Sequence, residues 1–311
     1  MKEGIDVKSH DLSLAALPGE RFVVEGFRLA DYWELTKPRL TFLVLITTLV
    51  GFCMGSNAPL DWFLLFHTIF GTALVAGGAA ALNQFMERDF DARMKRTVDR
   101  PLPSGKLSAA GALAFGLTLC GIGLLYLATA VNLLTTFLGM MTVISYLFIY
   151  TPLKRKTPFC TLIGAVPGAI PPLMGWSAVN GSLAPGAWVL FGILFFWQMP
   201  HFYALAQIYR EDYIKGGFPM LSVVDPTGQR ISRGILIHTA ALFFVSLIPT
   251  FLGMTGIIYF LGALFLGLCF LVFGLQAAIL RTTASCRFLF LGSIFYLPFL
   301  LMLMVATKLL G

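Results

Sequence analysis

Uninterrupted apolar runs of about 20 residues recur along this chain of 311 residues. A run of that length, folded as an α-helix, can cross the hydrocarbon core of a bilayer, which is about 30 Å thick. Only 12% of the residues are charged, against about 25% in a soluble domain. The strands of a membrane β-barrel would instead alternate apolar and polar residues. The sequence therefore predicts an all-α, polytopic membrane protein.

We expect about nine spanning helices. Their approximate ranges are 39–56, 62–85, 108–129, 131–150, 159–179, 186–206, 233–253, 255–278 and 288–307. Nearly all Lys and Arg residues fall in the N-terminal segment and in every second loop, and Lys308 alone falls on the other side. Because cytoplasmic loops carry the excess of Lys and Arg, we expect the N-terminus and the charged loops in the cytoplasm.

The chain begins with a polar segment of mixed charge. We expect residues 1–30 to form a mobile cytoplasmic tail and residues 31–311 to form one intramembrane domain. The segment "LADYWELTKPR", which runs from Leu29 to Arg39, predicts a short helix at the membrane interface, since its Trp and Tyr side chains suit the headgroup zone.

Carboxylates gather where the second predicted span ends. Asn83, Glu87 and Asp91 are spaced by four residues, which places them on one face of a helix. Asp89 lies on the adjoining face, and all four are candidate catalytic residues. Oxygen-only ligands without His or Cys favour a hard cation such as Mg²⁺. Asn83, Glu87 and Asp91 are therefore the candidate metal ligands.

Basic residues accompany these carboxylates and predict a site for a diphosphate bound with Mg²⁺. The candidate diphosphate ligands are Arg88, Lys95, Arg96, Arg100, Tyr150, Lys154, Arg210 and Lys215. The alternative interpretation is a set of solvated loops whose cations only orient the protein in the membrane.

The sixth predicted span carries Trp197, Gln198 and His201 within an otherwise apolar run. Polar side chains inside a span usually face a cavity or a partner helix, and Pro200 is expected to bend the helix. For His201, contact with a ligand and a hydrogen bond between helices both remain open.

The segment "NQFMERDFDARMKRTVDRPLPSG" resembles the first acidic motif of the UbiA-type intramembrane prenyltransferases. Within that superfamily, "YTPLKRKTPFCTLIGAVPGAIPPLMGW", "WQMPHFYALA" and "YREDYIKGGFPML" are similar to the branch that farnesylates haem. The resemblance extends from about Trp33 to near the end of the chain. It implies nine transmembrane helices around a central cavity, a cytoplasmic active site and Mg²⁺ as cofactor.

The resemblance also implies a reaction. The farnesyl group of farnesyl diphosphate would be joined to a vinyl group of haem b, with addition of water, to give haem O and diphosphate. The implied partners are farnesyl diphosphate, haem b and the lipid bilayer of a bacterial inner membrane. A haem A synthase or a terminal oxidase assembly is a further candidate partner, and no nucleic acid is expected.

The residues of the family's two motifs map onto this chain. The first motif falls on Asn83, Glu87 and Asp91, with Asp89 between them. The second falls on Tyr209, Glu211, Asp212 and Tyr213. Tyrosines stand at two positions where the wider superfamily often has Asp, which leaves open whether a second Mg²⁺ binds. Trp197, Gln198 and His201 become candidate haem contacts, with His201 as an axial ligand or a partner of a propionate.

Two alternatives remain open at this stage. One is an intramembrane prenyltransferase that acts on a different aromatic or quinone-precursor acceptor. The other is a membrane transporter, because "GAVPGAIPPLMG" is rich in the Gly and Pro residues that interrupt transporter helices. The charges cluster at one membrane face and not at the midplane, which favours an enzyme.

Overall fold

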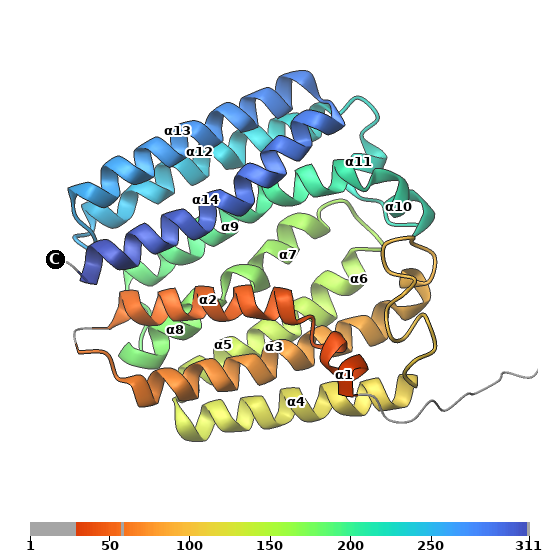
Figure 1. The fold of residues 1–311 in the computed structure, drawn as a ribbon, viewed down its shortest axis with the longest axis horizontal. Helices are drawn as coiled ribbons and strands as arrows, with labels where there is room; N and C mark the ends of the chain where they lie inside the picture. The colour runs from red at the N-terminus through yellow and green to blue at the C-terminus, as the bar shows by residue number, and fades with distance from the viewer. Residues whose placement is uncertain (1–28, 57–58, 310–311) are drawn as a thin grey trace, which may run out of the picture.

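The computed structural model describes residues 29–56 and 59–309, so most of the predicted tail lies outside the described residues. The first elements are α1 (Leu29–Leu35), α2 (Pro38–Gly55), α3 (Trp62–Asp91), α4 (Ala109–Ala130), α5 (Leu133–Ile144), the π-helical η1 (Ser145–Tyr150) and α6 (Thr151–Leu153) (Figure 1). Then follow α7 (Cys160–Ala169), α8 (Pro171–Asn180), α9 (Pro185–Ile208), α10 (Arg210–Lys215), α11 (Leu221–Val224), α12 (Gln229–Phe251), α13 (Ile257–Leu280) and α14 (Thr283–Leu309).

Among these described residues, nine helical segments are long and apolar enough to cross a membrane. Two of them are compound, namely α5–η1–α6 (Leu133–Leu153) and α7–α8 (Cys160–Asn180). The predicted all-α fold with nine spans is confirmed. The predicted ranges differ from the helices by a few residues, most visibly in α3, which continues as a helix to Asp91 instead of ending near residue 85.

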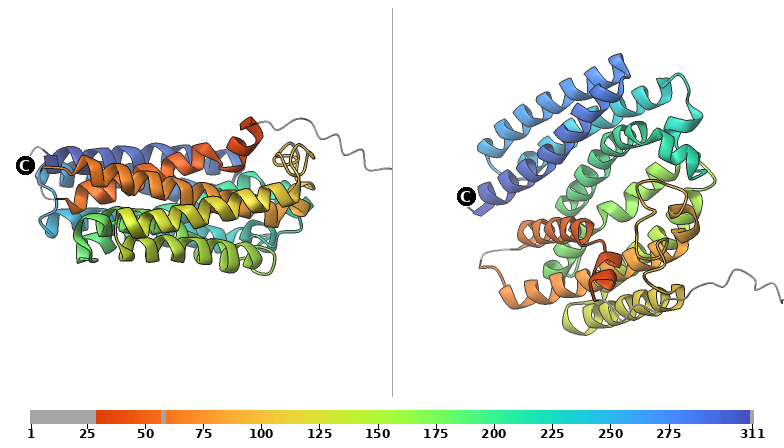
Figure 2. Two further views of the ribbon diagram at one scale, coloured as in Figure 1. Left: turned by 90° about the horizontal axis from the view of Figure 1, so that it is seen from below. Right: turned by 45° about the vertical axis from the view of Figure 1, so that its right-hand side comes forward.

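The spans form two groups that meet at α9. Helices α12, α13 and α14 lie together on one side, and α3 packs along α4 on the other (Figures 1 and 2). Helix α9 contacts α12, α14 and α7 and so joins the two groups. Its buried side chains Leu190, Ile193 and Leu194 belong to the largest apolar core of the described residues.

Helices α2 and α8 approach each other unusually closely. A Cβ atom on Gly175 of α8 would overlap the carbonyl oxygen of Thr48, and one on Gly51 of α2 would overlap the carbonyl oxygen of Pro172. Small residues allow such backbone approach between membrane helices. This contact sets the position of α2 against the rest of the bundle.

The polar segments lie at one end of the bundle. The end of α3, the loop that precedes α4, and helices α6, α10 and α11 all lie at the right-hand end of Figure 1. These elements carry the residues from which the candidate site is built.

Candidate active site

The candidate metal ligands form a buried row along α3. Asn83, Glu87 and Asp91 are 2%, 2% and 1% exposed. Four-residue spacing on one helix places them one turn apart, as predicted. Buried polar side chains must be hydrogen-bonded or paired, and each of the three has a basic partner from another part of the chain. We call the three residues the carboxamide–carboxylate ladder.

Two cations from different loops pair with the carboxylates of the ladder. Lys154 Nζ donates to both oxygens of Glu87, at 3.1 and 3.2 Å. Arg100 donates to Asp91 Oδ2 at 2.6 Å. Burial alone would lower the pKa of Lys154, but the adjacent Glu87 carboxylate outweighs it and raises that pKa. Lys154 is therefore a cation at neutral pH.

The third rung is held by Lys37, which belongs to the N-terminal segment whose Lys and Arg residues predict only the orientation in the membrane. Lys37 Nζ donates to Asn83 Oδ1 at 2.8 Å, and Asn83 Nδ2 donates to Thr151 Oγ1 at 3.0 Å. Burial and the nearby Arg100 lower the pKa of Lys37 to about 7, against the opposing effect of Glu87. Lys37 precedes α2 and has a left-handed backbone, with φ 49° and ψ 62°, which is uncommon for a residue other than Gly.

A second missed residue supports the end of α3. Arg155 donates to the carbonyl oxygen of Met86 at 2.6 Å, and its guanidinium lies 4.0 Å from the centre of the Phe90 ring. Both Lys37 and Arg155 lie in basic segments that the topology explains by itself. The sequence signal that distinguishes them is weak, because Lys37 is 46 residues from Asn83 and Arg155 is 69 from Met86.

Asp89 lies apart from the ladder. Its side chain is 72% exposed and pairs with Arg88 at 3.6 Å. The adjoining helix face on which we placed Asp89 is therefore turned to solvent. The structure does not bring Asp89 or its partner Arg88 together with the three buried rungs.

The loop after α3 connects the first motif to the second. The guanidinium carbon of Arg96 lies 5.4 Å from the ring centre of Tyr209 and 6.0 Å from that of Tyr213. Cations favour such positions over aromatic faces. Tyr213 is buried and Tyr209 is exposed. The remaining predicted residues of this region, Lys95, Glu211 and Lys215, are exposed, and Asp212 is half-buried.

Aromatic rings line the approach to Lys154. Its Nζ lies 4.9 Å from the ring centre of Phe218 and 6.0 Å from that of Tyr150. Tyr150 also stacks on Tyr146, with 5.7 Å between ring centres. Tyr150 thus lies near the Lys154–Glu87 pair.

The Arg210 side chain, a predicted diphosphate ligand, does not contact the ladder. Its Nε donates to the carbonyl oxygen of Ser222 at 2.8 Å, and the side chain lines a cavity beside α12. The structure does not bring Arg210 to the ladder, although it lies only one residue from Tyr209.

The three candidate haem contacts divide between two faces of α9. His201 Nδ1 and Ser293 Oγ share a hydrogen bond of 2.7 Å, and Trp197 Nε1 donates to the Ser293 carbonyl oxygen at 2.8 Å. The Trp197 and His201 rings stack, with 5.0 Å between their centres. Gln198 instead donates to the carbonyl oxygen of Ala165 on α7. For His201 this geometry is the interhelical hydrogen bond of the alternative interpretation.

The donor set of the ladder suits Mg²⁺. It offers two carboxylates and an amide oxygen on one buried face, and Mg²⁺ prefers oxygen ligands. Within the described ranges there is no cluster of three or more His, Cys, Asp or Glu side chains for a metal ion. Mg²⁺ usually keeps few protein ligands and shares the rest of its coordination with water and a substrate phosphate.

The comparison with protein families decides the assignment. The model described as "UbiA prenyltransferase family" matches residues 44–302. The chain belongs to the UbiA prenyltransferase family. With nine apolar helices among its described residues, this UbiA chain is a multi-pass membrane protein.

Curated relatives of this UbiA chain share one name. "Protoheme IX farnesyltransferase" of Solibacter usitatus is 49% identical over 289 residues, which cover 90% of this chain and 99% of the relative. The protein of that name from Opitutus terrae is 46% identical, with 91% of this chain and 96% of the relative covered. These relatives match the UbiA chain nearly from end to end.

Solved structures of UbiA proteins share the fold. A structure of digeranylgeranylglyceryl phosphate synthase has a TM-score of 0.78 at 17% identity and covers 91% of this chain and 99% of its own. A UbiA homologue from Archaeoglobus fulgidus bound to DMAPP and Mg²⁺ has a TM-score of 0.65 at 15% identity, with 90% and 100% covered. At these identities the likeness concerns the fold alone.

Proposed function

We propose that this chain transfers the farnesyl group of farnesyl diphosphate to a vinyl group of haem b, with addition of water, to give haem O and diphosphate. The observation that carries the proposal is the near end-to-end similarity, at 49% identity, to a protein named for protohaem IX farnesylation. The buried ladder with its three basic partners supports it, because such a set of groups suits a metal-bound diphosphate.

Asn83, Glu87 and Asp91 would hold Mg²⁺. When bound, this ion would neutralise negative charge on the diphosphate and make it a better leaving group. The chain's own cations have the same electrostatic task. Lys154 and Arg100 lie against the carboxylates, within reach of the oxygens of a diphosphate placed beside them, and Lys/Arg donors of this kind stabilise transferring or departing phosphates.

The bond changes balance without a redox partner. The bond between C1 of the farnesyl group and the diphosphate oxygen breaks, and the electron pair leaves with the diphosphate. The terminal vinyl carbon of haem b forms a new bond to that farnesyl carbon. A water oxygen then bonds to the cationic carbon next to the porphyrin, and one proton is released to solvent.

Aromatic faces near Lys154 suit the cationic character of this step. Tyr150 and Phe218 flank the Lys154 amino group, and aromatic rings attract cations through their quadrupole. These rings also form an apolar surface that limits the access of water to the allylic carbon. We assign the diphosphate subsite to the ladder and the prenyl subsite to the aromatic side of Lys154.

The proposal extends to the surroundings of the enzyme. We propose that it resides in a bacterial inner membrane with its N-terminus and the ladder on the cytoplasmic side, in line with the distribution of Lys and Arg among the loops. A haem A synthase or a terminal oxidase assembly as recipient of haem O stays a prediction.

The test uses membranes that contain the expressed chain, with labelled farnesyl diphosphate and either haem b or 4-hydroxybenzoate as acceptor. We expect label to enter a more hydrophobic haem, whose mass exceeds that of haem b by one farnesyl group plus one hydroxyl group. Chelation of divalent metal should stop the transfer, and added Mg²⁺ should restore it. Label in the benzoate product alone would identify a prenyltransferase with a different acceptor, and no transfer to either would contradict the proposal.

A further inference from the structure

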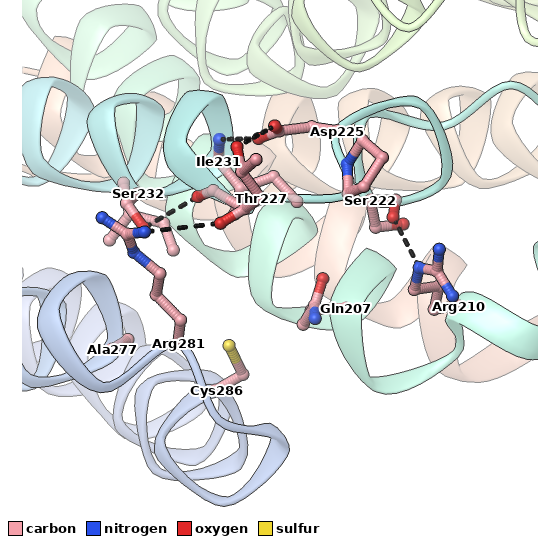
Figure 3. A pocket seen from close by; sticks show the side chains of 13 residues that line it. Gln207, Arg210, Ser222, Asp225, Thr227, Ile231, Ser232, Ala277, Arg281 and Cys286 are labelled. Carbon is pink, nitrogen blue, oxygen red and sulfur yellow. Dashed lines mark hydrogen bonds between the residues drawn. The ribbon is translucent and has the colours of Figure 1, made fainter.

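A cavity of about 90 Å³ lies apart from the ladder, among α9, the α11–α12 segment and the junction of α13 with α14 (Figure 3). Five residues that line it matter here, namely Gln207, Arg210, Ser222, Arg281 and Cys286. This volume can hold several water molecules, which is enough for a small polar group. The roles assigned to the first and second motifs do not use this cavity.

Hydrogen-bond donors in the cavity lack partners. The hydroxyl of Ser222, a residue only 1% exposed, has no hydrogen-bond partner among the described residues. Arg210 uses only its Nε, toward the Ser222 carbonyl oxygen. Arg281 uses Nε and one terminal nitrogen for the carbonyl oxygens of Ala278 and Thr227. The Ser222 hydroxyl is the buried donor of this set, since Arg210 is half-buried and Arg281 is exposed, and a buried donor left unpaired is costly. Together with the remaining guanidinium N–H groups of the two arginines, it indicates a ligand with acceptor oxygens.

The carboxylate of Asp225, which also lines the cavity, does not exclude a ligand with acceptor oxygens. Asp225 Oδ2 accepts hydrogen bonds from the backbone N–H groups of Arg230 and Ile231, and Oδ1 accepts one from Thr227 Oγ1. Figure 3 shows this side chain directed at the start of α12. With Asp225 engaged, the two guanidinium groups leave the cavity with an excess of positive charge. Arg is well suited to carboxylate and phosphate oxygens.

The cavity lies further along the same two helices, α9 and α14, whose contact includes His201. Gln207 follows His201 by six residues on α9, and Cys286 precedes Ser293 by seven on α14. At about 1.5 Å per residue these spacings correspond to roughly 9 and 10 Å along the helices. The His201–Ser293 pair, stacked with Trp197 and near Phe290, therefore lies roughly 10 Å from the cavity along the two helices.

We propose that this cavity binds a propionate carboxylate of the haem acceptor, with Arg210, Arg281 and Ser222 as its ligands. The proposal rests on the proposed function, because haem b is the acceptor there. A propionate is a compact anion on a short apolar stem, and it occupies one edge of a flat ring. An anionic edge bound here leaves the opposite, vinyl-bearing edge of the porphyrin free to reach another part of the bundle.

The experiment compares two variants with two ligands. Binding of haem b and of its dimethyl ester, in which both propionates are neutral, is titrated through the Soret band of the full-length protein in nanodiscs. For haem b, Arg281→Gln should raise Kd about tenfold, as expected for the loss of a charged hydrogen bond. Ser222→Ala should raise it a few-fold without a change in the thermal midpoint, because the hydroxyl has no partner to lose. Neither variant should weaken binding of the diester further.

Arg287→Gln is the matched control, since Arg287 is, like Arg281, an exposed arginine. It lies near the start of α14 and does not line the cavity. Equal Kd values for haem b in Arg281→Gln and Arg287→Gln would overturn the proposal. So would an equal loss of haem b and diester binding in Arg281→Gln. A phospholipid phosphate as the true occupant would instead make the Arg281→Gln effect appear only in nanodiscs with anionic lipid, and for both haems. Farnesyl transfer by the unaltered protein, measured separately, tests the proposed function.

Discussion

Asp91 and Asp89 are carboxylates two residues apart that the structure places in opposite environments. Asp91 is 1% exposed and accepts a hydrogen bond from Arg100, whereas the Asp89 side chain is 72% exposed. We expect Asp91→Asn to lower farnesyl transfer by about a hundredfold or more, since the site loses an anionic oxygen ligand for the metal. Asp89→Asn should stay within about twofold. Initial rates against Mg²⁺ concentration measure both.

The protein level and thermal midpoint of both aspartate variants serve as the control for folding. The ladder assignment would be wrong if Asp91→Asn kept normal turnover and normal Mg²⁺ dependence. Equal loss in both variants would show that the whole turn, and not the buried face, carries the activity.

At the scale of elements, the protonation state of Asp225 affects the stability of the N-terminal end of α12. Burial by itself would raise its pKa, but hydrogen bonds from Thr227 and from the backbone of Ile231 and Arg230 outweigh burial and lower it. A carboxylate with a lowered pKa in the folded state stabilises the fold above about pH 4, and this stabilisation is lost as the pH falls through the folded pKa. We expect Asp225→Ala to cost about 1 kcal/mol at pH 6.

The hydrogen bonds of Asp225 to the first turn of α12 predict that the difference in thermal stability between Asp225→Ala and the unaltered protein depends on pH. The difference in thermal midpoint in detergent should be largest near pH 6 and should shrink below about pH 4. Asp89→Ala, which removes an exposed aspartate, should show no such trend. A constant difference for Asp225→Ala at every pH would contradict the assignment.

The α2–α8 contact predicts a contrast between two helical glycines. Gly175→Ala should destabilise the protein by about 2 kcal/mol or more, because its Cβ would overlap the Thr48 carbonyl oxygen. Gly121→Ala on α4 meets nothing within 4 Å and should be neutral or slightly stabilising, since Ala is the better helix former. Thermal unfolding in one detergent measures both. Similar midpoints for the two variants would mean that α2 can move away from α8 without cost.

At the scale of the whole molecule, the loop charges predict which end faces the cytoplasm. Ser182 and Ser104 are exposed residues in loops at opposite ends of the bundle. In intact cells with a permeable outer membrane, an impermeant maleimide should label Ser182→Cys and not Ser104→Cys. Opening the inner membrane should make Ser104→Cys reactive. The reverse pattern would invert the proposed orientation.

The sequence predicted most of the fold and part of the geometry of the candidate site, for physical reasons that differ. Apolar runs predict spans because each helix must be long enough to cross the bilayer without help from other segments. The ladder is predictable because its three residues lie on one helix, which sets their spacing. The Lys37–Asn83 bond joins residues 46 positions apart, and no local pattern encodes such a contact. Arg210 and Asp89 show the same limit, since burial and neighbours from other elements decide where a side chain points.

Helix α3 has 30 residues and is therefore about 45 Å long, against a hydrocarbon core of about 30 Å. Its ladder occupies the last turns, so it stands at the depth of the lipid headgroups. A prenyl diphosphate dissolved in the same leaflet already holds its charged end at that depth and its chain among the lipid tails. The substrate then arrives by lateral diffusion, and the quantity that sets occupancy is its number per lipid and not per litre. Dilution of the membrane with inert phospholipid, at constant bulk amounts of enzyme and substrate, should accordingly slow the reaction.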